Sequence, residues 1–73
     1  MKIKQIIKII AKNINISEKK INQRSCANDF DAWDSLNHIK IILDLQKNLK
    51  KKISTSESIK LNSVKSILKF YKK

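Results

Sequence analysis

Isoleucines and lysines recur at helical spacing at the start of the chain. The apolar stripe consists of Ile3, Ile7, Ile10 and Ile14, flanked by Ile6 and Ile9. Lys4, Lys8 and Lys12 lie on the other side. This pattern predicts an amphipathic helix over residues 2–12.

Residues 13–33 are polar and follow no clear period, so we expect a long first loop. A loop of this length in a compact domain needs anchors to the core. The apolar side chains that we expect to anchor it are Ile14, Ile16, Ile21, Phe30 and Trp33. We also expect a short helical turn near residues 17–21.

A second helix is predicted over residues 35–49, because Asp34 is a favoured N-cap and apolar residues recur after it. They are Leu36, Ile39, Ile42, Leu43 and Leu49, with Ile41 and Leu45 widening the stripe. We expect Leu36 to face inward and to fix the rotation of the helix start. The stripe is wider than one packing face of a helix requires.

The remainder of the chain predicts two further helices. Lysines at residues 50–52 favour the end of the second helix, where its dipole is negative. Ser54 and Glu57 form the sequence signature of a capping box, which opens a short helix. Asn62 or Ser63 caps the last helix. The apolar positions of that helix are Val64, Ile67, Leu68 and Tyr71.

These elements predict an all-α fold in a single domain, residues 1–73. It has three principal helices, one short helix through about residue 60, and the long first loop. No stretch alternates well enough to be a strand. A chain of 73 residues builds one small core and lacks room for a catalytic pocket with the shell that would hold it rigid.

The composition excludes several kinds of site. The chain contains no Gly and no Pro, so it cannot build phosphate-cradling loops or nucleophile elbows. Cys26 and His38 are the only residues of their types, which leaves no internal disulfide and too few ligands for a zinc site. The apolar runs are short and interrupted by lysine. We therefore expect no secretion signal, no membrane span and a cytoplasmic monomer with a free thiol.

The net charge of +11 has two explanations. Such a charge is typical of proteins that bind nucleic acid or acidic membranes. However, Arg24 is the only arginine among 17 basic residues, and arginine makes the bidentate contacts to guanine and phosphate. Lysine, isoleucine and asparagine are all abundant and all have A/T-rich codons. The codon bias of an AT-rich genome is therefore the second explanation for much of the charge.

One segment, residues 33–38, carries candidate chemistry in the order Trp-Asp-Ser-Leu-Asn-His. Ser35 follows the N-cap Asp34, so we expect its hydroxyl to be exposed at the positive end of the longest helix. A phosphodiester on that hydroxyl would lie beside unpaired backbone N–H groups. Asp34 could help to position Mg²⁺ while a separate enzyme transfers the group.

This segment resembles a known family. Asp34-Ser35-Leu36 matches the Asp-Ser-Leu signature of acyl carrier proteins, and residues 33–38 are similar to a variant of stand-alone carriers. The context agrees, with a helix and a long loop before the motif and a helix of about fifteen residues after it. A short helix and a final helix follow. The resemblance covers essentially the whole chain.

The resemblance implies that Ser35 accepts a 4′-phosphopantetheine arm from coenzyme A. A phosphopantetheinyl transferase would recognise Asp34 and Leu36, the residues that flank Ser35. The arm would hold acyl or aminoacyl intermediates as thioesters and deliver them to enzymes of fatty-acid, polyketide, nonribosomal-peptide or related biosynthesis. The implied partners are the transferase, an acyl- or aminoacyl-loading ligase and acyl-transferring enzymes, and the chain itself performs no turnover.

The resemblance also implies an acyl cavity. The matching positions are Ile39, Ile42, Leu43, Ile59 and Leu61. Ordinary core packing remains the alternative for each of them. The partner-facing positions are Asn37, Lys40, Asp44 and Lys47. Carriers of this family usually have acids along this helix, whereas here only Asp44 is negative. The partners are therefore either acidic or recognise mainly the apolar residues and the arm.

Two other functions compete with the carrier. Ser35 and His38 lie three residues apart, with Asp31 and Asp34 near in sequence, which superficially suggests a hydrolytic triad. Side chains on one helix rarely aim at each other correctly, and no oxyanion-hole loop is evident. The stronger rival is a small basic helical nucleic-acid-binding protein. Lysines are spread over nearly every segment and few aromatics interleave with them, so we expect no nucleic-acid partner.

Overall fold

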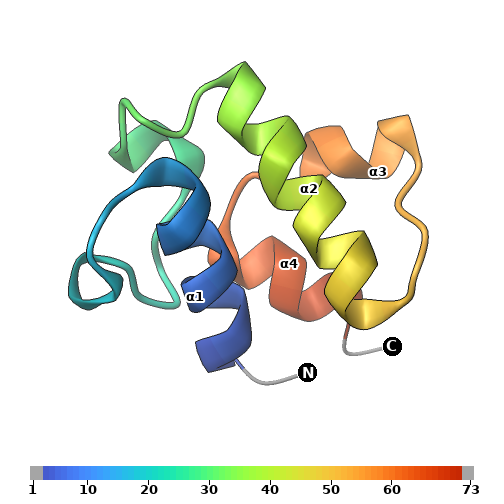
Figure 1. Cartoon of the computed structure of the whole chain (residues 1–73), viewed down its shortest axis with the longest axis horizontal. Helices are drawn as coiled ribbons and strands as arrows, with labels where there is room; N and C mark the ends of the chain where they lie inside the picture. The colour runs from blue at the N-terminus through green and yellow to red at the C-terminus, as the bar shows by residue number, and fades with distance from the viewer. Residues whose placement is uncertain (1–2, 72–73) are drawn as a thin grey trace.

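The computed structural model describes residues 3–71, whose backbone forms four α-helices and two short 3₁₀ helices (Figure 1). The elements are α1 (Ile3–Ile14), the 3₁₀ helices η1 (Glu18–Lys20) and η2 (Ala27–Asp29), α2 (Ser35–Leu49), α3 (Thr55–Lys60) and α4 (Val64–Tyr71). No strand forms within the described range, where Cys26 and Ser63 make an isolated antiparallel bridge. The predicted all-α bundle is confirmed, with three principal helices, one short helix and a long first loop.

Helix α1 extends to Ile14, two residues beyond the predicted end at residue 12. Asn15 ends it in the left-handed conformation, with φ of 56°. The N–H of Ile16 then donates to the carbonyl of Ala11 (3.1 Å), which is the bond of a Schellman motif. Asparagine tolerates this conformation better than other non-glycine residues, which matters in a chain without glycine.

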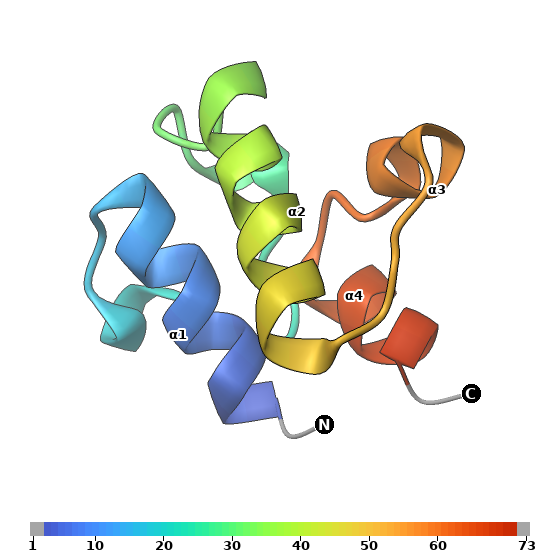
Figure 2. The ribbon, with the colours of Figure 1, turned by 45° about the vertical axis from the view of Figure 1, so that its right-hand side comes forward.

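The buried face of α1 is rotated from the predicted one. Ile6 and Ile10 are fully buried, whereas Ile3 and Ile7 are only partly covered. Ala11, which the isoleucine pattern did not single out, is also buried. The predicted stripe is therefore confirmed at Ile10 and Ile14. It was wrong at Ile3 and Ile7, where Ile6 is buried instead. The buried face is set by packing of α1 against α2, beside which it lies in Figure 2, and against α4.

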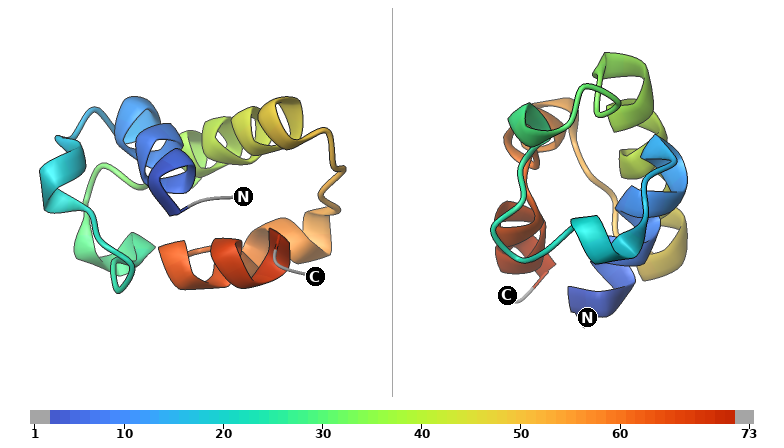
Figure 3. Two further views of the ribbon diagram at one scale, coloured as in Figure 1. Left: turned by 90° about the horizontal axis from the view of Figure 1, so that it is seen from below. Right: turned by 90° about the vertical axis from the view of Figure 1, so that its left-hand side faces the viewer.

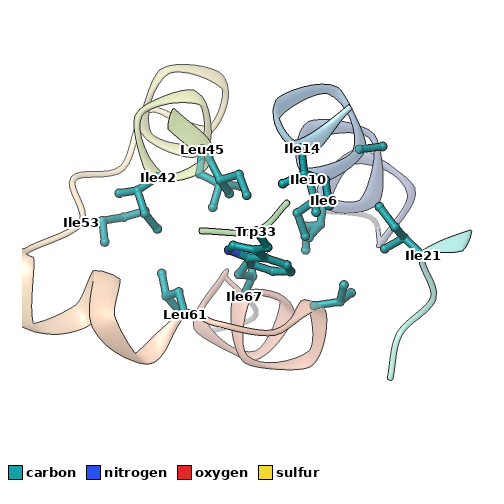
Figure 4. Close-up of a cluster of buried hydrophobic side chains, with 13 residues drawn as sticks. Ile6, Ile10, Ile14, Ile21, Trp33, Ile42, Leu45, Ile53, Leu61 and Ile67 are labelled. Carbon is teal, nitrogen blue, oxygen red and sulfur yellow. The ribbon is translucent and has the colours of Figure 1, made fainter. Parts of the chain in front are cut away.

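Large apolar side chains from all three principal helices form the core (Figure 4). The side chains with no exposed surface are Ile6, Ile10, Ile41, Leu45, Val64 and Ile67. Trp33, which precedes α2, is 6% exposed and lies among them. Burying each such side chain stabilises the fold by about 1.5–3 kcal/mol, so this cluster fixes how α2 is rotated.

The first loop is held by side chains and by backbone hydrogen bonds. Ile21 and Trp33 are buried, and the other predicted anchors also pack on the core. The predicted turn near residues 17–21 is confirmed as η1, whereas η2 was not predicted. The N–H of Ala27 donates to the carbonyl of Asn62 (2.7 Å), and the N–H of Val64 donates to the carbonyl of Ser25 (3.0 Å). These bonds tie the loop to the connection between α3 and α4 (Figure 3).

The predicted caps of the last two helices are present. Ser54 and Glu57 form the capping box of α3. The Ser63 hydroxyl accepts from the N–H of Ser66 (3.1 Å), so Ser63 rather than Asn62 caps α4. No helix between residues 3 and 71 has both the length and the apolar character needed to cross a membrane.

Candidate functional site

Ser35 is the first residue of α2, and its side chain is exposed to solvent. Asp34 precedes it with extended backbone angles, and Oδ1 of Asp34 accepts from the N–H of Asn37 (2.8 Å). This bond satisfies one of the N–H groups that a helix start leaves free. The N–H groups of Ser35 and Leu36 lie in the same turn, where no intrahelical acceptor exists. The predicted helix start is therefore confirmed, and Ser35 is exposed at its first position.

The turn before α2 is fixed by Asn37. Its Nδ2 donates to the carbonyl of Ala32 (2.7 Å), and the side chain is half-buried. The N–H of Trp33 donates to the carbonyl of Phe30 (3.1 Å) in the same turn. Asn37 was predicted to face a partner, and in the structure its amide holds the backbone that presents Ser35.

His38 connects α2 to two other parts of the chain. Its Nδ1 accepts from Nε1 of Trp33 (3.0 Å), and its Nε2 lies 2.7 Å from the carbonyl oxygen of Ser58 in α3. Because the indole N–H can only donate and the carbonyl can only accept, the network assigns a neutral ring with the proton on Nε2. Both ring nitrogens are therefore engaged in holding Trp33, α2 and α3 together.

The bridging role of His38 was not predicted from the sequence. The only local signal is the pairing of Trp33 and His38 at a distance of five residues across a helix start. Their rings stack with centroids 6.2 Å apart. The contact to Ser58 lies twenty residues further along the chain, and no local pattern reveals such a partner.

An open hollow of about 380 Å³ lies beside Ser35, between α2 and α3. Its volume falls at the lower end of the range for small-molecule pockets. The lining residues are Ala27, Trp33, Asp34, Ser35, His38, Ile39, Ser58, Ile59 and Asn62. The hollow is mainly apolar, with Asp34 as the only carboxylate in its lining.

The structure separates the five residues predicted to line an acyl cavity into three groups. Ile39 and Ile59 border the hollow beside Ser35. Ile42 and Leu61 are 7% and 3% exposed and belong to the core. Leu43 is 58% exposed on the outer side of α2.

Leu36 does not face inward, as the sequence had suggested, and its side chain is 64% exposed. The core side of α2 is set by Ile41 and Leu45, which are fully buried. Leu36 lies nine residues before Leu45, which is two and a half helical turns, and so it points to the opposite side. The start of α2 is oriented by Trp33 and His38 instead.

The other predicted partner-facing residues also differ among themselves. Lys40 and Lys47 are exposed. Asp44 is half-buried, and its Oδ2 accepts from Nδ2 of Asn13 in α1 (2.7 Å). The single acidic side chain of α2 therefore joins two helices, which leaves the exposed side of α2 cationic.

Two groups near the end of the chain have shifted pKa values. The backbone N–H and the hydroxyl of Ser54 bond to the Glu57 carboxylate and lower its pKa. Burial, followed by the charge of Glu57, raises the pKa of Tyr71. The hydroxyl oxygen of Tyr71 is buried with no hydrogen-bond partner among the described residues. Neither group lines the hollow beside Ser35.

Between residues 3 and 71, no three His, Cys, Asp or Glu side chains are grouped as they would be around a metal ion. No protein-family model matches the chain, and no curated protein sequence matches it significantly.

Proposed function

We propose that this chain is an acyl or peptidyl carrier, with an acyl-carrier-like helical bundle and a 4′-phosphopantetheine arm on Ser35. The single observation that carries the proposal is the exposed Ser35 hydroxyl at the first position of a 15-residue helix. A phosphodiester there is stabilised by free backbone N–H groups and by the positive end of the helix dipole. When attached, the arm supplies a thiol that holds a cargo as a thioester.

The surroundings of Ser35 fit such a group. The hydroxyl lies at the rim of the open hollow, so an attached chain can extend along it without displacing core side chains. Ile39 and Ile59 offer apolar contacts, and Ser58 and Asn62 lie in the same lining. Asp34 adjoins the hydroxyl and is exposed, which suits it to position Mg²⁺ during transfer by a phosphopantetheinyl transferase.

The proposed role is to accept acyl or aminoacyl intermediates from a loading ligase, hold them as thioesters and deliver them to acyl-transferring enzymes. The geometry favours this role over hydrolysis. A catalytic base next to Ser35 would need a free ring nitrogen, and both nitrogens of His38 are engaged by Trp33 and Ser58. The proton that the network assigns to Nε2 leaves no acceptor for the Ser35 hydroxyl.

A nucleic-acid-binding role has weaker support. Exposed lysines occur on every α-helix of the described range, for example Lys8, Lys40, Lys60 and Lys65. Proteins that read nucleic acid concentrate such charges along one face. Binding to duplex DNA that weakens steeply with salt would favour this alternative.

The decisive experiment is modification with coenzyme A and a broad-specificity phosphopantetheinyl transferase, followed by intact-mass spectrometry. We expect one adduct with the mass of a single phosphopantetheine group. The Ser35→Ala variant should show none, because it lacks the hydroxyl that is esterified. The matched control is Ser56→Ala, which removes another exposed helical serine and should leave the adduct unchanged.

An adduct on Ser35→Ala would contradict the assignment of the site, and an unmodified wild-type chain would contradict the carrier function. A circular dichroism melt of each variant shows whether it is folded. Ser35 makes no packing contact in the core, so we expect both variants to retain the wild-type melting temperature.

A further inference from the structure

Within residues 3–71, the exposed large apolar side chains are gathered in one region. They are Leu36, Ile39 and Leu43 on the outer side of α2 and Ile59 on α3, each more than half exposed. Small monomeric proteins scatter such residues singly, and a contiguous group marks a surface that is covered in a complex. Ile39 and Ile59 border the same hollow, so the group is contiguous across the two helices.

The apolar residues of α2 are in line with two cations. Leu36, Lys40, Leu43 and Lys47 follow one another at intervals of four, three and four residues, which places them along one side of a helix. We call these four residues the outer stripe. It begins next to Ser35 and spans about 16 Å at the usual helical rise.

The charge of the outer stripe is not neutralised by its own helix. Asp44 is the acid of α2, and its carboxylate bonds to Asn13 of α1. Asp34 lies at the helix start, and its carboxylate caps the helix. Lys40 and Lys47 are exposed, so the outer stripe presents its two cations to solvent.

We propose that the outer stripe, with Ile39 and Ile59 beside it, docks partner proteins whose contact surface is apolar and bordered by aspartate or glutamate. This inference rests on the proposed carrier function, since the partners are taken to be enzymes that act on the group attached to Ser35. Leucines in the centre of the contact exclude water, and lysines between them select acidic borders and speed the encounter.

Other occupants fit these residues less well. A second copy of the chain would bring lysines against lysines, which opposes pairing. A membrane-bound helix separates a broad apolar face from its cations, whereas here lysines alternate with leucines in one line. Nucleic acid would use the lysines and gain nothing from Leu36 and Leu43.

The test uses the full chain, labelled with ¹⁵N, and a synthetic helical peptide whose leucine stripe is bordered by glutamates. We expect the peptide to shift the amide signals of the outer stripe and of Ile59. A twin peptide with glutamine in place of each glutamate should bind roughly tenfold more weakly, because the charge complementarity is lost. A DNA duplex and vesicles of phosphatidylcholine with phosphatidylglycerol are titrated separately.

Charge-reversal variants identify the surface. The Lys40→Glu/Lys47→Glu variant should bind the glutamate peptide about tenfold or more weakly than the wild type does. The matched control is Lys4→Glu/Lys8→Glu, which makes the same change in net charge with exposed lysines of α1 and should bind as the wild type does. The Leu43→Ser variant should bind both peptides about tenfold more weakly, since it lacks an apolar contact.

Equal binding of the two peptides, signal shifts confined to other helices, or equal weakening in the α1 control would overturn the docking proposal. Tighter binding of DNA or vesicles through the same stripe would overturn it as well. The adduct on Ser35 is measured on the same samples. If the adduct forms and the peptide does not shift the signals of the outer stripe, only the docking inference fails. If the peptide shifts those signals and no adduct forms, the carrier function fails.

Discussion

The two sides of α2 contain the same kinds of apolar residue in opposite surroundings. Ile41 and Leu45 have no exposed surface, whereas Ile39 and Leu43 are 57% and 58% exposed. Helical spacing places an apolar residue on a given side, but packing against α1 and membership of the shared core decide whether that side is covered. The inner side therefore stabilises the fold, while the outer side remains exposed to solvent.

The largest loss of stability is expected when a buried leucine of α2 is truncated, and an exposed leucine of the same helix is the matched control. Leu45→Ala should lower the free energy of unfolding by about 2–5 kcal/mol, because it leaves a cavity in the core. Leu43→Ala should change it by no more than about 0.5 kcal/mol. Urea unfolding followed by circular dichroism measures both. Similar losses in the two variants would show that the sides do not differ as described.

The next prediction concerns His38, which lies on the same side of α2 as the buried Leu45, two helical turns before it. His38→Phe keeps a ring and leaves the Trp33 indole N–H and the Ser58 carbonyl without their partner. Leaving such groups unsatisfied costs about 1–3 kcal/mol each, so we expect a clear loss of stability in the same urea assay.

The matched control for His38 is Asn48→Ala, also on α2. Its Nδ2 donates only to the carbonyl of Asp44 on its own helix and is exposed, so water replaces the bond. We expect no loss of stability in this variant. A free energy of unfolding in His38→Phe equal to that of the wild type would mean that the bridge to α3 does not contribute to the fold.

The smallest effect is expected at the exposed start of α3. The bonds from Ser54 hold the pKa of Glu57 below its usual value of 4.5. This contribution to stability is therefore present above pH 4.5 and is lost as the pH falls through the lower pKa of the folded state. Glu57→Gln retains an acceptor for the capping box and has no charge to titrate. We expect its melting temperature to fall less on acidification than that of the wild type.

Melting temperatures at neutral pH and below pH 4.5 measure this difference. Ser54→Ala removes the hydroxyl and should reduce the same acid dependence in part. An acid dependence of Glu57→Gln equal to that of the wild type would show that the capping box does not couple α3 to pH.

Much of the fold follows from local patterns. The N-cap Asp34, the capping box of Ser54 and Glu57, and the isoleucine spacing of α1 each predict an element that the structure contains. Caps and periodicity act within one or two helical turns, so they are visible in a single sequence. η2 was missed because Cys26 stands at its N-cap, a position where serine, threonine, aspartate or asparagine would be the usual signal.

The site was predictable only in part. The exposed Ser35 at the helix start follows from its neighbour Asp34. The outward direction of Leu36, the bridge from His38 to Ser58 and the bond from Asn13 to Asp44 depend on residues from other helices. The sequence pattern offered one wide apolar stripe on α2 and no means to decide which part of it is buried.

The sequence by itself determined which segments form the four α-helices of the described range, where α2 begins, and that a serine stands at its first position. Only the tertiary structure decided which side of α2 is buried and which polar side chains are used to hold helices together. The physical reason is the sequence distance over which each kind of interaction acts. Capping and helical periodicity are contacts between near neighbours, whereas burial is the outcome of all helices competing for one small core.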